Sequence, residues 1–166
     1  MNAIKMDALI RRSSKEDLVE ILGLFYNTVL NVCKDDYNHD QLMAWVSSAS
    51  NKDKWLSKME QTHFIVALAG VRIVGFASLA DRGYVDILYV HKDFQKQGIA
   101  SKLLSELERK AKTLEVDLIS SDVSITARPF FENKGYALLR TNINLSLIHI
   151  YRRREGLPCI CTRMAR

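Results

Sequence analysis

The chain has 166 residues, of which 48% are hydrophobic and 26% charged, a balance typical of one globular domain and unlike that of collagen-like or low-complexity chains. Its apolar stretches are shorter than the roughly 18 residues of a membrane span, and its start lacks the apolar segment of a secretory signal, so we expect a cytoplasmic protein without a membrane partner. The net charge is +5, but residues 151–166 hold +4 of it, so the near-neutral body gives no indication of a polyanion partner.

After a short entry strand, the apolar residues of the first part of the chain recur at helical intervals. Ser13 and Glu16 have the spacing of a capping box, which predicts the start of the first helix. The expected elements are a strand over residues 8–11, helices over residues 15–31 and 40–47, and a further turn over residues 51–59. A polar connection over residues 34–39 separates the first two helices.

From residue 62 the period of the apolar pattern changes from 3.6 to 2. A hairpin signal at Ala69-Gly70 and a turn at residues 81–83 join three such runs, which predicts an antiparallel meander. An amphipathic helix opening at residues 95–100 then leads to a strand parallel to the third meander strand, as in a βαβ crossover. The expected strands cover residues 62–68, 73–79, 84–90, 117–121 and 136–144, with a short helix over residues 128–133. This order predicts one domain of the α+β class.

The last segment of the chain has an unusual sequence. Residues Leu145 to Ile150 read LSLIHI, precede an arginine-rich run, and resemble the translation of the transposon end used in sequencing-library adapters. We therefore predict a single domain over residues 1–144 and a non-native or disordered tail over residues 145–166. The alternative is a native strand over residues 144–151 followed by a basic tail.

Cysteine usage excludes a disulfide framework and a metal-ligand pattern. Cys33 stands alone in the body, while Cys159 and Cys161 belong to the tail. We therefore expect no metal. Cys33 falls on a predicted helix, where it is either a small buried hydrophobe or a reactive thiol.

The most informative segment joins the end of the 84–90 strand to the next helix. Gln95-x-x-Gly98-x-Ala100 opens that helix, so backbone N–H groups and the positive end of the helix dipole converge there. Gly98 has no Cβ, so a phosphate can approach the backbone closely. The segment is neither a Walker loop nor a dinucleotide fingerprint, because it lacks Gly-Lys-Ser/Thr and has a single glycine. We predict an anion site at this helix start.

A second motif, Thr126 to Tyr136, places a short helix before Gly-Tyr, and with Gln95-x-x-Gly98-x-Ala100 it resembles the GNAT superfamily of acyl-CoA-dependent N-acyltransferases. The resemblance covers roughly residues 8–144. It implies an α/β/α sandwich with a mixed, mostly antiparallel sheet and a central parallel pair that splays apart. It also implies that acetyl-CoA is the cosubstrate, with its thioester between the 84–90 and 117–124 strands.

The resemblance implies roles for individual residues in binding acetyl-CoA. The amides of Gln95 to Ser101 bind the pyrophosphate, and the backbone of Leu88 to Val90 pairs with the pantetheine arm. The implied cofactor-binding residues are Leu88, Tyr89, Val90, Gln95, Lys96, Gln97, Gly98, Ile99, Ala100, Ser101, Ser124 and Phe131. The neighbouring His91 is interpreted as a solvated loop residue.

Asp86 is the candidate general base because a carboxylate on a central strand needs a functional or hydrogen-bonding reason. Strand alternation predicts that it shares a face with Tyr84 and Leu88. Asp86 either removes the proton of the acceptor amine, or it bonds a neighbouring loop or the substrate ammonium without titrating. Asp122, on the opposite strand, is a second carboxylate and a weaker candidate for a polar role in the site.

The general acid is not assigned. Where many relatives have a tyrosine in the second motif, this chain has Phe131, which cannot donate a proton. Either the coenzyme A thiolate leaves without a dedicated acid, which its thiol pKa of about 8–9 permits, or Tyr26, Tyr37 or Ser124 serves.

Acceptor specificity is expected from residues 29–45 and from the second and third strands of the meander. Asp35, Asp36, Tyr37, His39 and Asp40 form an acidic and aromatic cluster that either recruits a cationic amine or is a solvated loop. The predicted reaction transfers the acetyl group directly to a primary amine of a small molecule or peptide, since Cys33 is expected to lie far from the loop. The alternatives are a non-catalytic acyl-CoA-binding module and, on the arginine-rich end alone, a nucleic-acid-binding protein. A homodimer is left open.

Overall fold

The computed structural model describes residues 7–142 and 147–153. The helices and strands in chain order are β1 (Leu9–Arg12), α1 (Leu18–Val32), α2 (His39–Ser47), α3 (Lys52–Gln61), β2 (His63–Ala69), β3 (Arg72–Ala80), β4 (Tyr84–Val90), α4 (Ile99–Thr113), β5 (Leu118–Ser124), α5 (Arg128–Asn133), β6 (Ala137–Asn142) and β7 (Leu147–Arg153). Short 3-10 turns cover Lys15–Asp17, Ser48–Ser50, Asp81–Gly83 and Lys92–Phe94. Within the described ranges, no helix combines the length and apolarity needed to cross a membrane.

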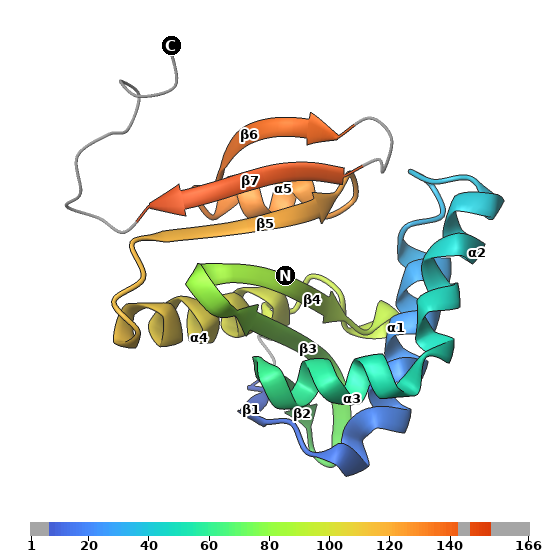
Figure 1. The fold of residues 1–166 in the computed structure, drawn as a ribbon. Helices are drawn as coiled ribbons and strands as arrows, with labels where there is room; N and C mark the ends of the chain where they lie inside the picture. The colour runs from blue at the N-terminus through green and yellow to red at the C-terminus, as the bar shows by residue number, and fades with distance from the viewer. Residues whose placement is uncertain (1–6, 143–146, 154–166) are drawn as a thin grey trace, which may run out of the picture.

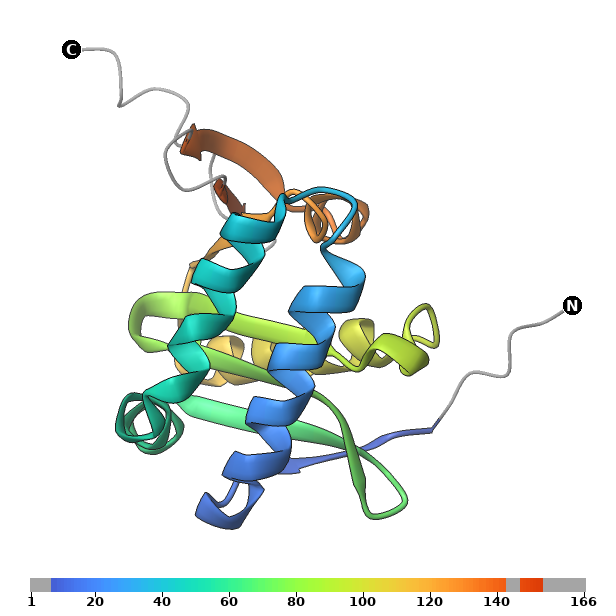
Figure 2. The same cartoon turned by 90° about the vertical axis from the view of Figure 1, so that its right-hand side faces the viewer.

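The described strands form one sheet in the order β1-β2-β3-β4-β5-β7-β6, in which β4 and β5 are the parallel pair and the other neighbours are antiparallel (Figure 1). Figure 2 shows α1, α2 and α3 in front of the strands, with α4 behind them. Each face of the sheet has its own apolar cluster. Residues of α1–α3 pack on one face, and residues of α4 and α5 pack on the other. The predicted α/β/α arrangement and α+β class are confirmed.

The parallel strands β4 and β5 meet at one end and diverge at the other. Tyr84 and Ser120 are the residue pair in register between them. Gly83 allows this approach: it has a φ of +81°, and a Cβ there would lie 2.5 Å from the Leu118 carbonyl oxygen. One residue further along β5, the Ser121 hydroxyl donates to the Val85 carbonyl at 2.7 Å. Beyond these contacts the register ends and the edge of β4 is open.

A bulge in β4 decides where Asp86 points. In the pairing with β3, Val85 lies opposite Leu79 and Ile87 lies opposite Ser78, so Asp86 is an extra residue. The bulge breaks the alternation of side chains. Ile87 joins the cluster under α1–α3, whereas Leu88 packs against the cluster on the α4 side. Asp86 bonds to Lys58 of α3, so the prediction that Asp86 shares a face with Leu88 is wrong.

The C-terminal part of the sheet differs from the predicted tail. Residues 147–153 form β7, which lies between β5 and β6 and pairs antiparallel with both. Ile150 at its centre is fully buried. These residues form a strand, as the alternative interpretation expects, and not a disordered segment. Pairing with a strand on each side satisfies the backbone hydrogen bonds of β7. Residues 143–146 and 154–166 lie outside the described residues, and the non-native origin of residues 145–166 stays a prediction.

Candidate active site

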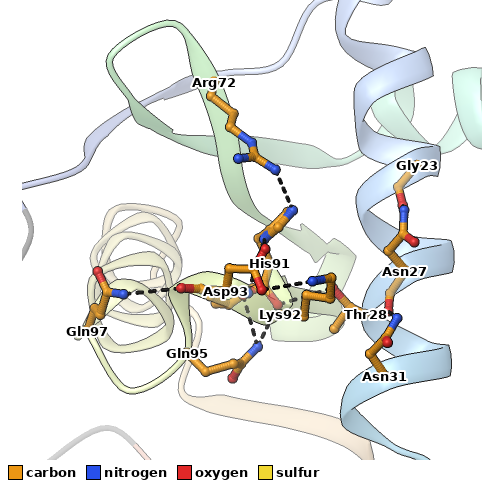
Figure 3. Close-up of polar contacts among 11 residues, drawn as sticks. Gly23, Asn27, Thr28, Asn31, Arg72, His91, Lys92, Asp93, Gln95 and Gln97 are labelled. Carbon is orange, nitrogen blue, oxygen red and sulfur yellow. Dashed lines mark hydrogen bonds and ion pairs between the residues drawn. The ribbon is translucent and has the colours of Figure 1, made fainter.

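A cavity of about 680 Å³ lies where β4 and β5 diverge. Its walls come from α1, α2, β4, the loop before α4, the start of α4, β5 and α5. Asp86 lines it, and so do all the predicted cofactor-binding residues except Gln97. Gln97 instead turns toward the preceding turn, where its amide donates to the Asp93 carbonyl at 3.4 Å (Figure 3).

The loop before α4 has the backbone geometry of a cradle. Lys96 and Gly98 have positive φ values of 60° and 84°, and Gly98 is the N-cap of α4. Because the first amides of a helix have no carbonyl partner within it, the amides that open α4 face the loop with unpaired donors. Gly75 of β3 allows this helix start to lie close to the sheet, since a Cβ there would be 3.0 Å from side-chain carbons of Ile99 and Leu103. The arrangement suits an anion.

Gln95 holds the loop to the end of β4. Its side-chain amide donates to the Val90 carbonyl at 2.6 Å, and the Thr28 hydroxyl of α1 donates to the same carbonyl at 3.2 Å. The side chain of Gln95 therefore fixes the shape of the cradle and leaves ligand contact to the backbone. The carbonyl of Val90 is also withdrawn from pairing with a ligand.

His91 lies beneath this loop and is buried, so its interpretation as a solvated residue is wrong. Arg72 donates to its Nε2 at 2.7 Å. A guanidinium group is a donor only, so Nε2 accepts and the ring is neutral. Burial lowers the pKa of His91, and the charge of Arg72 lowers it further. The guanidinium also lies over the ring of Phe94, and this contact connects the start of β3 to the turn before the cradle.

Two carboxylates line the cavity on opposite strands. Asp86 of β4 is ion-paired with Lys58 of α3, and both side chains are about a quarter exposed, 25% and 26%. Asp122 of β5 accepts a hydrogen bond from the Tyr84 hydroxyl at 3.0 Å. Burial raises the pKa of Tyr84 to about 12, and the charges of Asp122 and Asp86 add to the shift. Tyr84 therefore stays protonated and keeps its bond to Asp122.

The connection between α1 and α2 is attached to the segment after β5. The Ile125 amide donates to the Tyr37 hydroxyl at 2.9 Å, and the Thr126 hydroxyl donates to Asp36 at 2.6 Å. None of the five residues of the predicted acidic and aromatic cluster lines the cavity; Asp35, His39 and Asp40 are exposed. The solvated-loop interpretation fits these three, and Asp36 and Tyr37 have a structural role.

Cys33 is expected to lie far from the loop, and this distance stays a prediction. The residue is buried at the end of α1 and lines the cavity. Burial raises the pKa of its thiol, so the group is protonated at neutral pH and is a poor nucleophile. Direct transfer therefore remains the prediction. Within the described ranges, no three His, Cys, Asp or Glu side chains gather as metal ligands would.

Some lining residues were not found from the sequence. Thr28 lines the cavity and Lys58 contacts Asp86, yet each lies on a helix whose pattern predicts only burial of an apolar face. Trp45, at the end of the 29–45 segment expected to set acceptor specificity, also lines the cavity. Of the proposed acids, Ser124 lines the cavity, while Tyr26 is 42% exposed on α1. Phe131 is buried and lines the cavity.

The chain has relatives among known proteins. Residues 33–145 match the family model described as an acetyltransferase (GNAT) domain. The uncharacterized N-acetyltransferase YafP of Escherichia coli is 30% identical over 131 residues, which cover 79% of this chain and 82% of YafP. A GCN5-related N-acetyltransferase from Rhodopseudomonas palustris superposes with a TM-score of 0.87 at 25% identity, covering 93% of this chain and all of that one. PaiA N-acetyltransferase from Thermoplasma acidophilum, solved in complex with coenzyme A, shares the fold with a TM-score of 0.81 at 19% identity, covering 90% of this chain and all of PaiA.

Proposed function

This chain belongs to the GNAT acetyltransferase family and is therefore an acyltransferase, and from this premise we propose that it transfers an acetyl group from acetyl-CoA directly to a primary amine of a small molecule or peptide. The observation that carries the proposal is the single cavity that connects the cradle at the start of α4 with Asp86 across the divergence of β4 and β5. The proposed site for the acyl donor and the Asp86 carboxylate thus line the same cavity.

The donor site is proposed to be built mainly from backbone. Amides of residues 95–101 hold the pyrophosphate, because the unpaired donors at the start of α4 and the helix dipole both favour an anion. The open edge of β4 at Leu88 and Tyr89 accepts the pantetheine arm as an added strand. Ser124 of β5 and Phe131 of α5 form the opposite wall. Acetyl-CoA supplies the activated acyl group.

The acceptor site is proposed to lie on the α1–α3 side of the sheet. There Asp86 offers a carboxylate at the cavity wall, and an ammonium group competes with Lys58 for it. Asp86 accepts the proton that the amine must lose to become a nucleophile. Its place on the bulge brings the carboxylate to the point where β4 and β5 part.

The test measures coenzyme A release from acetyl-CoA with a panel of primary amines, for the wild type, Asp86→Asn and Asp53→Asn. Asp53 is an exposed carboxylate on the same helix as Lys58, so its variant is the matched control. We expect kcat to fall about 100-fold or more in Asp86→Asn, the usual size of general-base effects. The affinity for acetyl-CoA, measured by calorimetry, should stay within about threefold.

Two results would contradict the proposal. Equal rates for Asp86→Asn and the wild type across pH 6 to 9 would remove the base role of Asp86. Tight acetyl-CoA binding with no amine-dependent release across the panel would support a non-catalytic acyl-CoA-binding module instead.

A further inference from the structure

The apolar residues that line the cavity belong to two separate clusters. Lining residues such as Leu88 and Phe131 pack with the cluster on the α4 side of the sheet and flank the proposed site for acetyl-CoA. A second group packs with the cluster under α1–α3, on the side where the acceptor site is proposed. We call this group the acceptor wall, and its members are Cys33, Trp45, Ile87 and Tyr89.

The acceptor wall offers a ligand mainly apolar contact. Ile87 and Cys33 are buried, and a neutral thiol behaves as a small apolar group. The ring of Tyr89 packs among aromatic residues of the same cluster. Thr28 of α1 also lines the cavity, but its hydroxyl already donates to a carbonyl of β4 at 3.2 Å. Such a surface suits the apolar body of a ligand.

Trp45 is the largest side chain of the acceptor wall, and its neighbours hold it in place. Its ring lies edge-on to that of Tyr37, with the ring centroids 5.3 Å apart and the planes at 68°. Tyr37 is itself buried, and its hydroxyl accepts a hydrogen bond from the Ile125 amide at 2.9 Å. These contacts connect the indole of α2 to the segment after β5, so this part of the wall is formed before a ligand binds.

The charges along the cavity disfavour an anionic acceptor. Among the residues that the structure describes, the charged side chains of the lining are Asp86, Asp122 and Lys96, and Lys96 belongs to the cradle proposed to hold the pyrophosphate. The other two are carboxylates, which repel a carboxylate on the acceptor and attract an ammonium group. Lys58 reaches Asp86 from α3 but is not one of the lining residues.

We propose that the acceptor is a primary amine with an aromatic or branched alkyl body and no carboxylate, and that Trp45 is the residue that selects this body. The inference rests on the proposed function and deepens it by naming the class of acceptor. The ammonium group meets Asp86 while the body packs against the indole, which removes apolar surface from water. A second charge on the body would lose its hydration at this wall without gaining a partner.

The first test measures kcat/KM for coenzyme A release from acetyl-CoA with matched amines. Phenethylamine represents the proposed class. Butylamine lacks the ring, phenylalanine adds a carboxylate to the same body, and putrescine has a second ammonium group in place of the ring. We expect kcat/KM for phenethylamine to exceed that of each of the others by about 10-fold or more, the usual size of discrimination by an apolar pocket.

The second test compares Trp45→Ala with Met43→Ala, whose side chain lies on the same helix, is 41% exposed and does not line the cavity. In Trp45→Ala, kcat/KM should fall about 10- to 100-fold for phenethylamine and at least about fivefold less for butylamine. The KM for acetyl-CoA should change less than about threefold. Met43→Ala should match the wild type. Trp45→Leu should show a smaller loss in the same direction and serves if Trp45→Ala folds poorly.

The outcomes are distinguishable from those of the proposed function. If amines are acetylated but phenylalanine or putrescine is preferred to phenethylamine, the acceptor class is wrong and the proposed function stands. Equal losses for phenethylamine and butylamine in Trp45→Ala, or a large rise in the KM for acetyl-CoA, would overturn the role of Trp45 in selecting the acceptor.

If no amine is acetylated, the proposed function fails, and calorimetry with phenethylamine in the presence of coenzyme A decides the inference. Binding to the wild type that is lost in Trp45→Ala would support it. The absence of binding to the wild type would overturn it.

Discussion

The ion pair between Lys58 and Asp86 joins α3 to the bulge in β4. Both side chains are about a quarter exposed, so water screens the pair and its contribution to stability is expected to be small. The pair nevertheless sets the direction of the carboxylate at the cavity wall. Its role is therefore mainly positional.

A double-mutant cycle with Lys58→Met and Asp86→Asn measures this contribution. We expect a coupling free energy below about 1 kcal/mol in urea denaturation, and a smaller value in high salt. The pair of Lys15 and Glu60, whose side chains are 71% and 54% exposed, is the matched control, and its coupling should be near zero. A coupling above about 2 kcal/mol would show that the Lys58 pair is effectively buried.

Single residues also show where sequence reasoning stops. A carboxylate at Asp86 is conspicuous within an apolar strand, but Lys58 lies on another element and no spacing rule connects the two. The capping box is another case, because Ser13 with Glu16 and Ser14 with Asp17 have the same spacing. The structure has the second pair. Two hydrogen bonds from Arg11, at 2.7 and 2.8 Å, hold the Asp17 carboxylate, and the Ser14 amide donates to it at 2.8 Å.

At the scale of elements, the strands and helices follow the apolar period closely. β4 and α5 have the bounds that the sequence predicts, and α3 extends the expected turn into a ten-residue helix. The bulge in β4 escaped prediction because an inserted residue leaves the apolar composition of the strand unchanged. β7 was only the alternative prediction because its residues resemble a foreign sequence, and its position between β5 and β6 is set by pairing that the apolar pattern does not show.

The substitution Ile150→Ala tests the contribution of β7. Ile150 is fully buried at the centre of the strand, so the cavity left by alanine should lower the free energy of unfolding by about 2–4 kcal/mol. Its register partner Leu138 is 45% exposed, and Leu138→Ala should cost less than about 1 kcal/mol. The measurement is urea denaturation followed by circular dichroism. Equal, small losses for both variants would mean that residues 147–153 add nothing to the fold.

At the scale of the whole molecule, the cavity lies between two parts of the sheet. Strands β1–β4 form one part, and β5, β7 and β6 form the other. Gly83 and the Tyr84–Ser120 pairing join them at one end, while Tyr37 and Asp36 connect α1–α2 to the segment after β5. Contacts at both ends hold the parts together and leave the middle open. The crossover was predictable from the sequence, whereas this second attachment was not, because it joins loops through side chains.

Two histidines make the stability of the whole molecule depend on pH. Arg72 donates to His91, and Arg12 lies 2.9 Å from Nδ1 of His63, so both rings are held neutral as acceptors. Burial lowers the pKa of each, and the neighbouring arginine lowers it further. The unfolded chain, with histidine pKa values of about 6.5, therefore binds more protons than the folded protein below neutral pH.

The direction in which the free energy of unfolding changes with pH follows from this difference in bound protons. The free energy of unfolding should change little between about pH 7 and 8 and fall as the pH drops through about 6.5 toward the folded-state pKa values. The double variant His63→Gln/His91→Gln should lose most of this slope between pH 7 and 5, as measured by urea denaturation at each pH. A separate decline below about pH 4 should persist in that variant, because Arg11 lowers the pKa of Asp17 and that stabilisation disappears on protonation. An unchanged slope between pH 7 and 5 in the double variant would assign the pH dependence to other groups.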